Sequence, residues 1–222
     1  MSKVLLIVPT HNYSLNYPVF LSFSDFPSGY GYLTSALKEA GHEVYGCNPN
    51  NIVGYSNAYQ MIQDVISKRI MDVEPDLIGL GGLCTDYGFL KDAIGIIRNT
   101  TESPIVLGGQ IVTNDAEDIF NYLKPDYAIV GEAEKTIVEL ANELPEPGIL
   151  KAHPIRNLNT LPFPDYEPFG VQEMLDKFSM ATRLLYRYSR PEPRPFTIVA
   201  SRGCPFRCTF CIHGPRDVKY RE

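Results

Sequence analysis

The sequence has no apolar run long enough to span a membrane and no nucleotide-binding signature. Neither a G-x-G-x-x-G turn after the first apolar segment nor a G-x4-G-K-[ST] loop is present, which excludes a dinucleotide fingerprint and an NTP-binding P-loop. The apolar start is too short for a signal peptide and is typical of a first strand. Five cysteines, an odd number with three clustered, argue against a disulfide framework and favour the reducing cytoplasm. We therefore expect a cytoplasmic protein without a membrane partner.

The chain has 222 residues, of which 44% are hydrophobic and 21% are charged, enough to bury a core. This length fits one ordinary domain with an appendage, or two small domains. The net charge of -6 is unevenly distributed, because residues 183–222 carry a net charge of +6 and the remainder carries -12. No nucleic-acid reading motif accompanies the basic segment, so a nucleic-acid partner is not expected. Its arginines either surround an anionic ligand or form a solvated surface.

Three of the five cysteines lie within eight residues, as Cys204, Cys208 and Cys211. Thiolates are soft ligands, and the C-x3-C-x2-C spacing allows one loop to wrap a single metal centre. A four-iron cluster held by three cysteines would leave one iron open to a small molecule. The alternative is a closed Cys3His zinc site in which His213 supplies the fourth ligand. The spacing by itself leaves both possibilities open.

The first 144 residues alternate apolar runs with segments of helical period, which predicts parallel strands joined by crossover helices. The fold class is therefore α/β, with a Rossmann-like open sheet of five parallel strands. The expected strands are 3–8, 43–47, 77–80, 104–107 and 127–130. The expected helices are 29–40, 56–71, 86–98, 116–123 and 134–143.

In such a sheet the loops after the strands form the ligand crevice, where flexible backbone and helix N-termini gather. Glycines recur in these loops, and they either serve tight turns or let the backbone approach a large flat ligand. We favour a large ligand. The candidate residues are Thr10, His11, Gly82, Thr85, Gly108, Gly109, Gln110, Gly131 and Glu132.

Six prolines within residues 145–170 predict a linker that cannot form long helices or sheet ladders. Residues 171–188 have the pattern of a helix, and three further prolines end it before 196. The run Phe196–Ala200 is apolar and predicts a strand that leads into the cysteine loop. The expected organisation is thus a sheet domain at 1–144, a linker with one helix at 145–195, and a fragment of a second domain at 196–222.

The segment S-R-G-C-P-F-R-C-T-F-C that follows this strand closely resembles the start of radical S-adenosylmethionine (SAM) enzymes. The resemblance implies that Cys204, Cys208 and Cys211 hold a [4Fe-4S] cluster on the loop after the first strand of a partial barrel. It also implies that Phe210 lies near the SAM adenine, and that an electron donor such as a flavodoxin or ferredoxin is needed.

Residues 1–144 are similar to the cobalamin-binding domain that precedes the barrel in one large class of radical SAM enzymes. The resemblance rests on P-S-G-Y-G-Y-L-T-S-A-L-K-E-A-G-H-E-V, P-D-L-I-G-L, I-V-L-G-G-Q and D-Y-A-I-V-G-E-A-E-K-T, in that family's order. It implies that the strand-end loops hold the corrin, with Gly108-Gly109-Gln110 and Gly131-Glu132 as the nearest motif matches. Cobalamin mutases and methionine synthases carry D-x-H-x-x-G after the first strand, and its histidine is the lower ligand of cobalt. Pro9–Ser14 contains His11 but lacks the Asp and Gly of this motif, so His11 is expected in a polar loop rather than on cobalt.

The resemblance implies a cobalamin-dependent radical SAM methyltransferase that acts on a small-molecule or peptide substrate. Two alternatives remain: a cyclase or another non-methylating enzyme with the same domain order, and a non-catalytic corrinoid-binding module with a zinc loop. A barrel commonly needs about 200 or more residues, and only 27 residues follow Pro195 in this sequence. The 222-residue chain by itself is therefore expected to be inactive even if it binds cobalamin.

Overall fold

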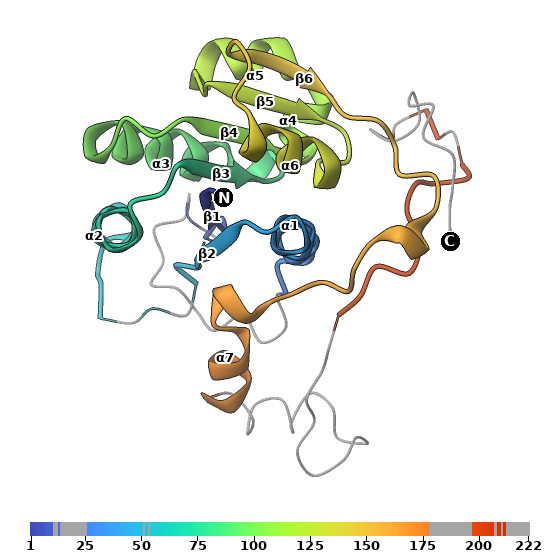
Figure 1. Cartoon of the computed structure of the whole chain (residues 1–222). Coiled ribbons are helices and arrows are strands. Elements are labelled where there is room, and N and C mark those ends of the chain that lie inside the picture. The colour runs from blue at the N-terminus through green and yellow to red at the C-terminus, as the bar shows by residue number, and fades with distance from the viewer. Residues whose placement is uncertain are drawn as a thin grey trace.

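The computed structural model describes residues 1–10, 13, 26–50, 52, 54–177, 197–206, 208, 209 and 211. At its centre is a parallel sheet with the strand order β2-β1-β3-β4-β5-β6 (Figure 1). The strands are β1 (Lys3–Ile7), β2 (Glu43–Cys47), β3 (Leu77–Gly81), β4 (Ile105–Gly108), β5 (Tyr127–Val130) and β6 (Gly148–Lys151). The predicted Rossmann-like α/β class is confirmed, with one more strand than the five expected.

The α-helices lie on both faces of this sheet (Figure 1). They are α1 (Ser28–Glu39), α2 (Ala58–Val73), α3 (Tyr87–Thr100), α4 (Gly109–Asn114), α5 (Ala116–Leu123), α6 (Glu134–Asn142) and α7 (Val171–Lys177). Helices α2, α3 and α5 pack on one face, whereas α1 and α6 lie side by side on the other.

Alternation along β1 explains the two layers. Leu5 and Ile7 belong to the apolar cluster under α2 and α3, whereas Val4 and Leu6 belong to the cluster under α1 and α6. All four side chains are fully buried, as expected for a central parallel strand covered on both faces. At about 25 cal/mol per Å² of apolar surface, such burial is the main stabilising contribution to this sheet.

The strand order fixes the place of a ligand site. The chain leaves β1 through α1 toward β2 at one edge, and then crosses through α2 to β3 on the other side of β1. Adjacent connections thus leave the sheet in opposite directions between β1 and β3. Open α/β sheets bind ligands at such a switch point, beyond the carboxyl ends of the strands.

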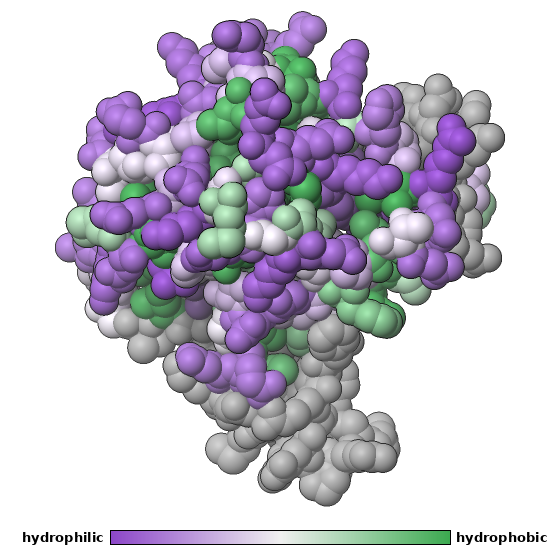
Figure 2. Space-filling view, viewed as in Figure 1, coloured by the Kyte–Doolittle hydropathy of each residue, from purple (hydrophilic) through white to green (hydrophobic). Residues whose placement is uncertain are grey.

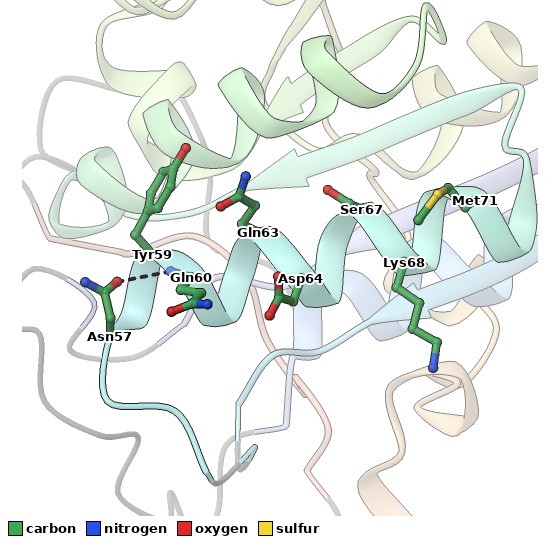
Figure 3. A pocket seen from close by; sticks show the side chains of 8 residues that line it. All are labelled: Asn57, Tyr59, Gln60, Gln63, Asp64, Ser67, Lys68 and Met71. Atoms are coloured by element: carbon green, nitrogen blue, oxygen red, sulfur yellow. Dashed lines mark hydrogen bonds between the residues drawn. The ribbon is translucent and has the colours of Figure 1, made fainter.

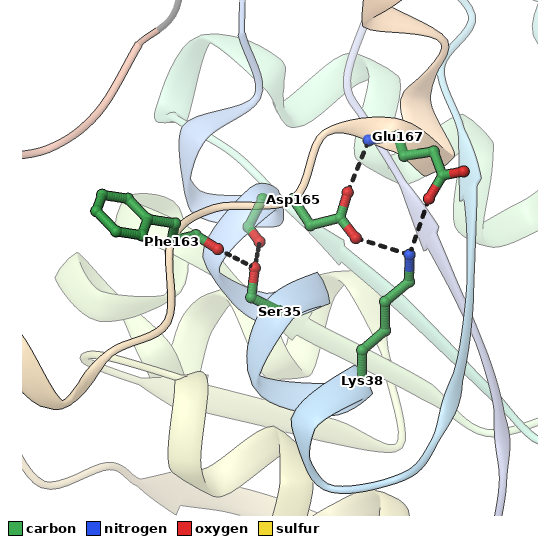
Figure 4. A network of polar contacts seen from close by, with 6 residues as sticks. Ser35, Lys38, Phe163, Asp165 and Glu167 are labelled. Atoms are coloured by element: carbon green, nitrogen blue, oxygen red, sulfur yellow. Dashed lines mark hydrogen bonds and ion pairs between the residues drawn. The ribbon is translucent and has the colours of Figure 1, made fainter.

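The connection after β6 packs on the sheet domain, and its first part is not a plain linker. It runs from the edge strand β6 across α1 to the opposite edge, where the 3-10 helix Glu167–Phe169 packs on β2. Ser35 Oγ donates to the carbonyl oxygen of Phe163 at 2.5 Å, and Lys38 Nζ lies 2.7 Å from Asp165 Oδ2 (Figure 4). Tyr166 and Phe169 are buried in the apolar cluster under α1. The connection therefore covers part of one face of the domain.

Three sequence predictions differ from the structure. β6 was missed because the proline density suggested no strand, yet no proline lies within Gly148–Lys151, so each residue can join the ladder with β5. α4 was expected to be loop. The strand predicted at 196–200 is wrong where it is described, because residues 197–200 are irregular and exposed, and tyrosine hydroxyls replace a neighbouring strand as partners of their backbone.

The remaining elements agree with the predicted ranges to within a few residues. Of the helix predicted at 171–188, α7 covers the first part, and residues 178–188 lie outside the described residues. The face in Figure 2 is largely hydrophilic, with apolar side chains scattered across it. Within the described part of the chain, no helix combines the length and apolarity needed to cross a membrane.

Candidate functional site

The loops after β3 and β4 meet through their main chains. A Cβ atom on Gly109 would lie 2.6 Å from the backbone nitrogen of Gly82, and Gly109 has a φ of +85°. The amide of Ile111 donates to the carbonyl oxygen of Gly82 at 3.1 Å and ties the two turns together. Only glycine fits at position 109, both for space and for backbone conformation. The two turns consequently form a surface of bare backbone at the carboxyl edge of the sheet.

A second link joins the turns after β4 and β5. Thr113 Oγ1 donates to the carbonyl oxygen of Gly109 at 2.9 Å and accepts from the amide of Gly131 at 3.1 Å. Gly131 has a φ of +103°, which again favours glycine. The structure therefore brings Gly82, Gly108, Gly109 and Gly131 together along one edge of the sheet. Gln110 follows in the first turn of α4, and its side chain is exposed there.

Thr10, just beyond β1, is 2% exposed, and its hydroxyl oxygen has no hydrogen-bond partner among the described residues. A buried hydroxyl without a partner is unfavourable, and a bound ligand can supply the missing hydrogen bond. Thr10 lies beside the switch point between β1 and β3. It is therefore the predicted site residue whose environment points most directly to a ligand.

The turn after β3 is held by Asp86. Its Oδ2 accepts from the amide of Leu83 at 2.8 Å, and a Cβ on Gly82 would approach this oxygen to 2.6 Å. Thr85 and Cys84 belong to the short 3-10 helix Cys84–Asp86, and both side chains are exposed. Thr85 is thus accessible beside the crevice.

Two residues that the sequence reasoning missed also shape this edge. Tyr30 of α1 donates its hydroxyl to the carbonyl oxygen of Gly81 at 2.7 Å, and burial raises the pKa of Tyr30 well above its usual value. Asn50, after β2, donates from Nδ2 to the carbonyl oxygen of Pro9 at 2.9 Å. Both side chains brace the turns beside the switch point. The sequence signal for Asn50 was its place after a strand, and Tyr30 lies within the P-S-G-Y-G-Y stretch, which does not by itself reveal the partner of its hydroxyl.

Glu132 is bound to protein groups in this structure. Its Oε2 accepts from the amide of Ile155 at 2.6 Å, and its Oε1 lies 3.8 Å from a guanidinium nitrogen of Arg202. The carboxylate therefore joins β5 to the connection and to the segment before the cysteine loop. Both oxygens of this carboxylate therefore have partners within the protein.

The three clustered cysteines are free thiols. Cys204 and Cys208 are exposed, Cys211 is partly buried, and the amide of Cys211 donates to the carbonyl oxygen of Cys208 at 3.0 Å. In the ranges that the structure describes, no group of three or more His, Cys, Asp or Glu side chains gathers as a metal site. The donor chemistry suits iron, but the three thiols are not preassembled. His11, Phe210 and His213 lie outside the described residues.

A shallow hollow on the outer surface of α2 lies apart from these residues (Figure 3). Its lining comes from α2 and the residue before it: Asn57, Tyr59, Gln60, Gln63, Asp64, Ser67, Lys68 and Met71. None of the predicted site residues takes part. We therefore place the candidate site at the carboxyl edge of the sheet.

Comparison with known families agrees with this geometry. Residues 26–141 match the B12 binding domain. The chain belongs to the B12-binding domain family. This B12-binding region includes the bare turns after β3, β4 and β5, and it confirms the predicted cobalamin-binding type of domain.

Two curated relatives share sequence with the chain. An uncharacterized methyltransferase of Pyrococcus horikoshii is 27% identical over 94% of this chain and 45% of its own length. An uncharacterized protein of Methanocaldococcus jannaschii is 29% identical over 44% of this chain and 20% of its own length. The chain thus spans less than half the length of these relatives.

Among solved structures, the radical S-adenosylmethionine methyltransferase TsrM from Kitasatospora setae has the same fold over part of its length. With tryptophan and a SAM analogue bound, it superposes with a TM-score of 0.51 and 22% identity, over 64% of this chain and 25% of that chain. The structure of TsrM with cobalamin and a [4Fe-4S] cluster gives a TM-score of 0.50 and 22% identity over similar shares. At this level of identity the likeness concerns the fold of the B12-binding region.

Proposed function

We propose that the chain binds cobalamin at the carboxyl edge of its sheet and forms part of a cobalamin-dependent radical SAM methyltransferase. The carrying observation is the bare backbone surface at Gly82 and Gly109 within a B12-binding family, together with the Thr10 hydroxyl, which has no hydrogen-bond partner in the described ranges. A corrin is large and flat and carries polar groups around its rim. A surface without side chains, with a buried hydroxyl nearby that has no partner in the described part of the chain, fits such a ligand.

The chain's own residues have distinct parts in this proposal. Gly109 and Gly131 keep the floor of the crevice low, and Thr113 holds their two turns in register. Thr85 and Gln110 supply exposed side chains at the rim, and Thr10 supplies its buried hydroxyl beside the switch point. When bound, methylcobalamin supplies a methyl group for transfer, and the protein contributes binding, orientation and exclusion of water.

The radical SAM part of the proposal rests on the cysteine spacing and on the S-R-G-C-P sequence that contains the first cysteine. Cys204, Cys208 and Cys211 would ligate a [4Fe-4S] cluster, with Phe210 beside the SAM adenine. When bound and reduced, such a cluster would supply one electron for the cleavage of SAM to methionine and a 5'-deoxyadenosyl radical, which would take a hydrogen atom from the substrate. The Pyrococcus relative, itself named a methyltransferase, supports methyl transfer as the reaction class. The whole enzyme would need a small-molecule or peptide substrate and an electron donor such as a flavodoxin or ferredoxin.

Cobalamin binding is tested by titrating the 222-residue chain with hydroxocobalamin and separating bound from free corrin by gel filtration. We expect about one corrin to remain per chain. The variant G109A should lose retention, whereas G95A, a change on the exposed surface of α3, should keep it. Corrin that elutes entirely apart from the wild-type chain would refute the cobalamin proposal.

The metal is tested separately by anaerobic reconstitution with iron and sulfide, followed by metal analysis and electron paramagnetic resonance. We expect about four irons per chain and the signal of a reduced cluster after dithionite. Stoichiometric zinc with no uptake of iron would instead identify a closed zinc site, and the radical SAM part of the proposal would then fail.

A further inference from the structure

Arg202, two residues before Cys204, is held on the B12-binding region by three side chains. Its guanidinium lies 2.5 Å from Glu134 Oε1 and 3.8 Å from Glu132 Oε1, and its Cζ stands 5.1 Å from the centroid of the Tyr32 ring. The Arg202 side chain is only 15% exposed. A planar guanidinium can stack on a ring and donate to carboxylates at the same time, which an ammonium cannot do equally well.

The carboxylate of Glu134 would destabilise the fold if Arg202 did not pair with it. Glu134 is 5% exposed, and its second oxygen, Oε2, has no hydrogen-bond partner among the described residues. A buried carboxylate without a cation is strongly destabilising or must take up a proton. Arg202 therefore neutralises the charge of a carboxylate that is buried in the folded chain. The acid precedes its partner by about seventy residues, so the pair closes a long loop.

The backbone before Arg202 is fixed by two tyrosines. Tyr32 and the amide of Val199 form a hydrogen bond of 3.2 Å between the hydroxyl oxygen and the nitrogen. Tyr166 donates its hydroxyl to the carbonyl oxygen of Thr197 at 2.7 Å. We call residues 197–203 the lead-in. Although residues 197–200 are exposed, the lead-in is bound through its backbone at Thr197 and Val199 and through the side chain of Arg202.

The acids that bind Arg202 follow β5, and Gly131 of the same turn is linked through Thr113 to Gly109. The lead-in is thus attached at the edge of the sheet that carries the candidate crevice. We propose that Arg202 is a positioning residue that anchors the lead-in there and so sets the place of the cysteine loop relative to the corrin crevice. The functional meaning of this anchor rests on the function proposed above, whereas the anchor itself does not.

The anchor is tested by hydrogen–deuterium exchange of the chain without cofactors. In R202A we expect amides of the lead-in to exchange about tenfold faster, while amides of β1 and β3 keep their rates. R202K, which keeps the charge but loses the planar fork, should retain part of the protection. The control R156A removes an exposed arginine of the connection and should change nothing in the lead-in.

A double variant separates anchoring from general stability. R202A leaves Glu134 unpaired and should lower the melting temperature, and adding Glu134→Gln should recover most of that loss because no buried charge remains. The lead-in should nevertheless stay unprotected in E134Q/R202A. Unchanged protection in R202A, or protection restored by Glu134→Gln, would overturn the proposal. If the wild-type chain retained neither corrin nor iron, the proposed function would fail while these exchange rates would still decide the anchor.

Discussion

The backbone nitrogen of Gly82 lies 2.6 Å from the point where a Cβ atom of Gly109 would stand. The turns after two neighbouring strands thus touch with nothing between their main chains. Gly81 contributes to the same contact, since its own Cβ would meet the carbonyl group of Gly108 at 3.0 Å. A side chain at any of these positions would separate the turns and raise the floor of the crevice.

We expect G109A to lower the free energy of unfolding by about 1–3 kcal/mol, because alanine is strained at a φ of +85° and its methyl group collides with backbone. Urea denaturation followed by circular dichroism measures this change. Retention of hydroxocobalamin should fall in the same variant at concentrations of urea where the protein is still folded.

The matched control is G95A, because Gly95 lies within α3 and a Cβ there meets nothing within 4 Å. Alanine favours helix over glycine by about 0.5–1 kcal/mol, so this variant should be slightly more stable than the wild type. Equal stability of G109A and G95A would contradict the backbone contact between the two turns.

Most of the fold could be predicted from the sequence because its strands and helices carry strong periodic signals. Strands such as Tyr127–Val130 and helices such as Ala116–Leu123 coincide with their predicted ranges. β6 was not predicted because the strand has only four residues and lies between prolines. It forms by pairing with the edge of β5, which the local sequence does not reveal. At residues 197–200 the opposite error occurred, because a strand was predicted where the structure has none. An apolar run becomes a strand only where another strand pairs with it.

The candidate site was predictable where it depends on backbone. Glycines after strands report close approach and positive φ from the sequence alone, as Gly109 and Gly131 do. Side-chain partners across the fold leave no such local signal. The pairing of Arg202 with Glu134 and the binding of Tyr30 to Gly81 arise only when distant segments are packed together.

The five cysteines should separate into two classes. We expect C204A, C208A and C211A each to lose most reconstituted iron, because a three-thiolate site cannot spare a ligand. C47A and C84A should keep their iron. Cys47 is buried, and burial raises the pKa of its thiol to about 12, so it does not offer a thiolate near neutral pH. Iron content per chain after anaerobic desalting is the measurement, and equal iron in all five variants would exclude the proposed ligand set.

The connection after β6 should be loosened by G31A. A Cβ on Gly31 would lie 2.5 Å from a ring carbon of Tyr166 and 3.0 Å from Pro164, both of them buried. We expect a loss of about 1–3 kcal/mol in stability, as for other overpacked sites. Faster hydrogen exchange should appear at residues 163–170, and also in the lead-in that Tyr166 binds. G29A, on the same helix with nothing within 4 Å, should leave these rates unchanged.

Acid should destabilise the fold partly through His42, which is 6% exposed and accepts a hydrogen bond at Nδ1 from the amide of Ser2 at 3.3 Å. Burial, and after it the positive charge of the amino terminus, lowers the pKa of His42 in the folded protein below its usual value. The unfolded chain, with a histidine pKa of about 6.5, therefore binds the proton first. The contribution of neutral His42 to stability is complete above that pH and is lost as the pH falls toward the lower folded pKa. Urea unfolding at pH 7.5 and 5.5 should show a smaller acid-induced loss for H42Q than for the wild type. H153Q, which changes an exposed histidine, should match the wild type, and an equal loss in H42Q would show that His42 does not carry the effect.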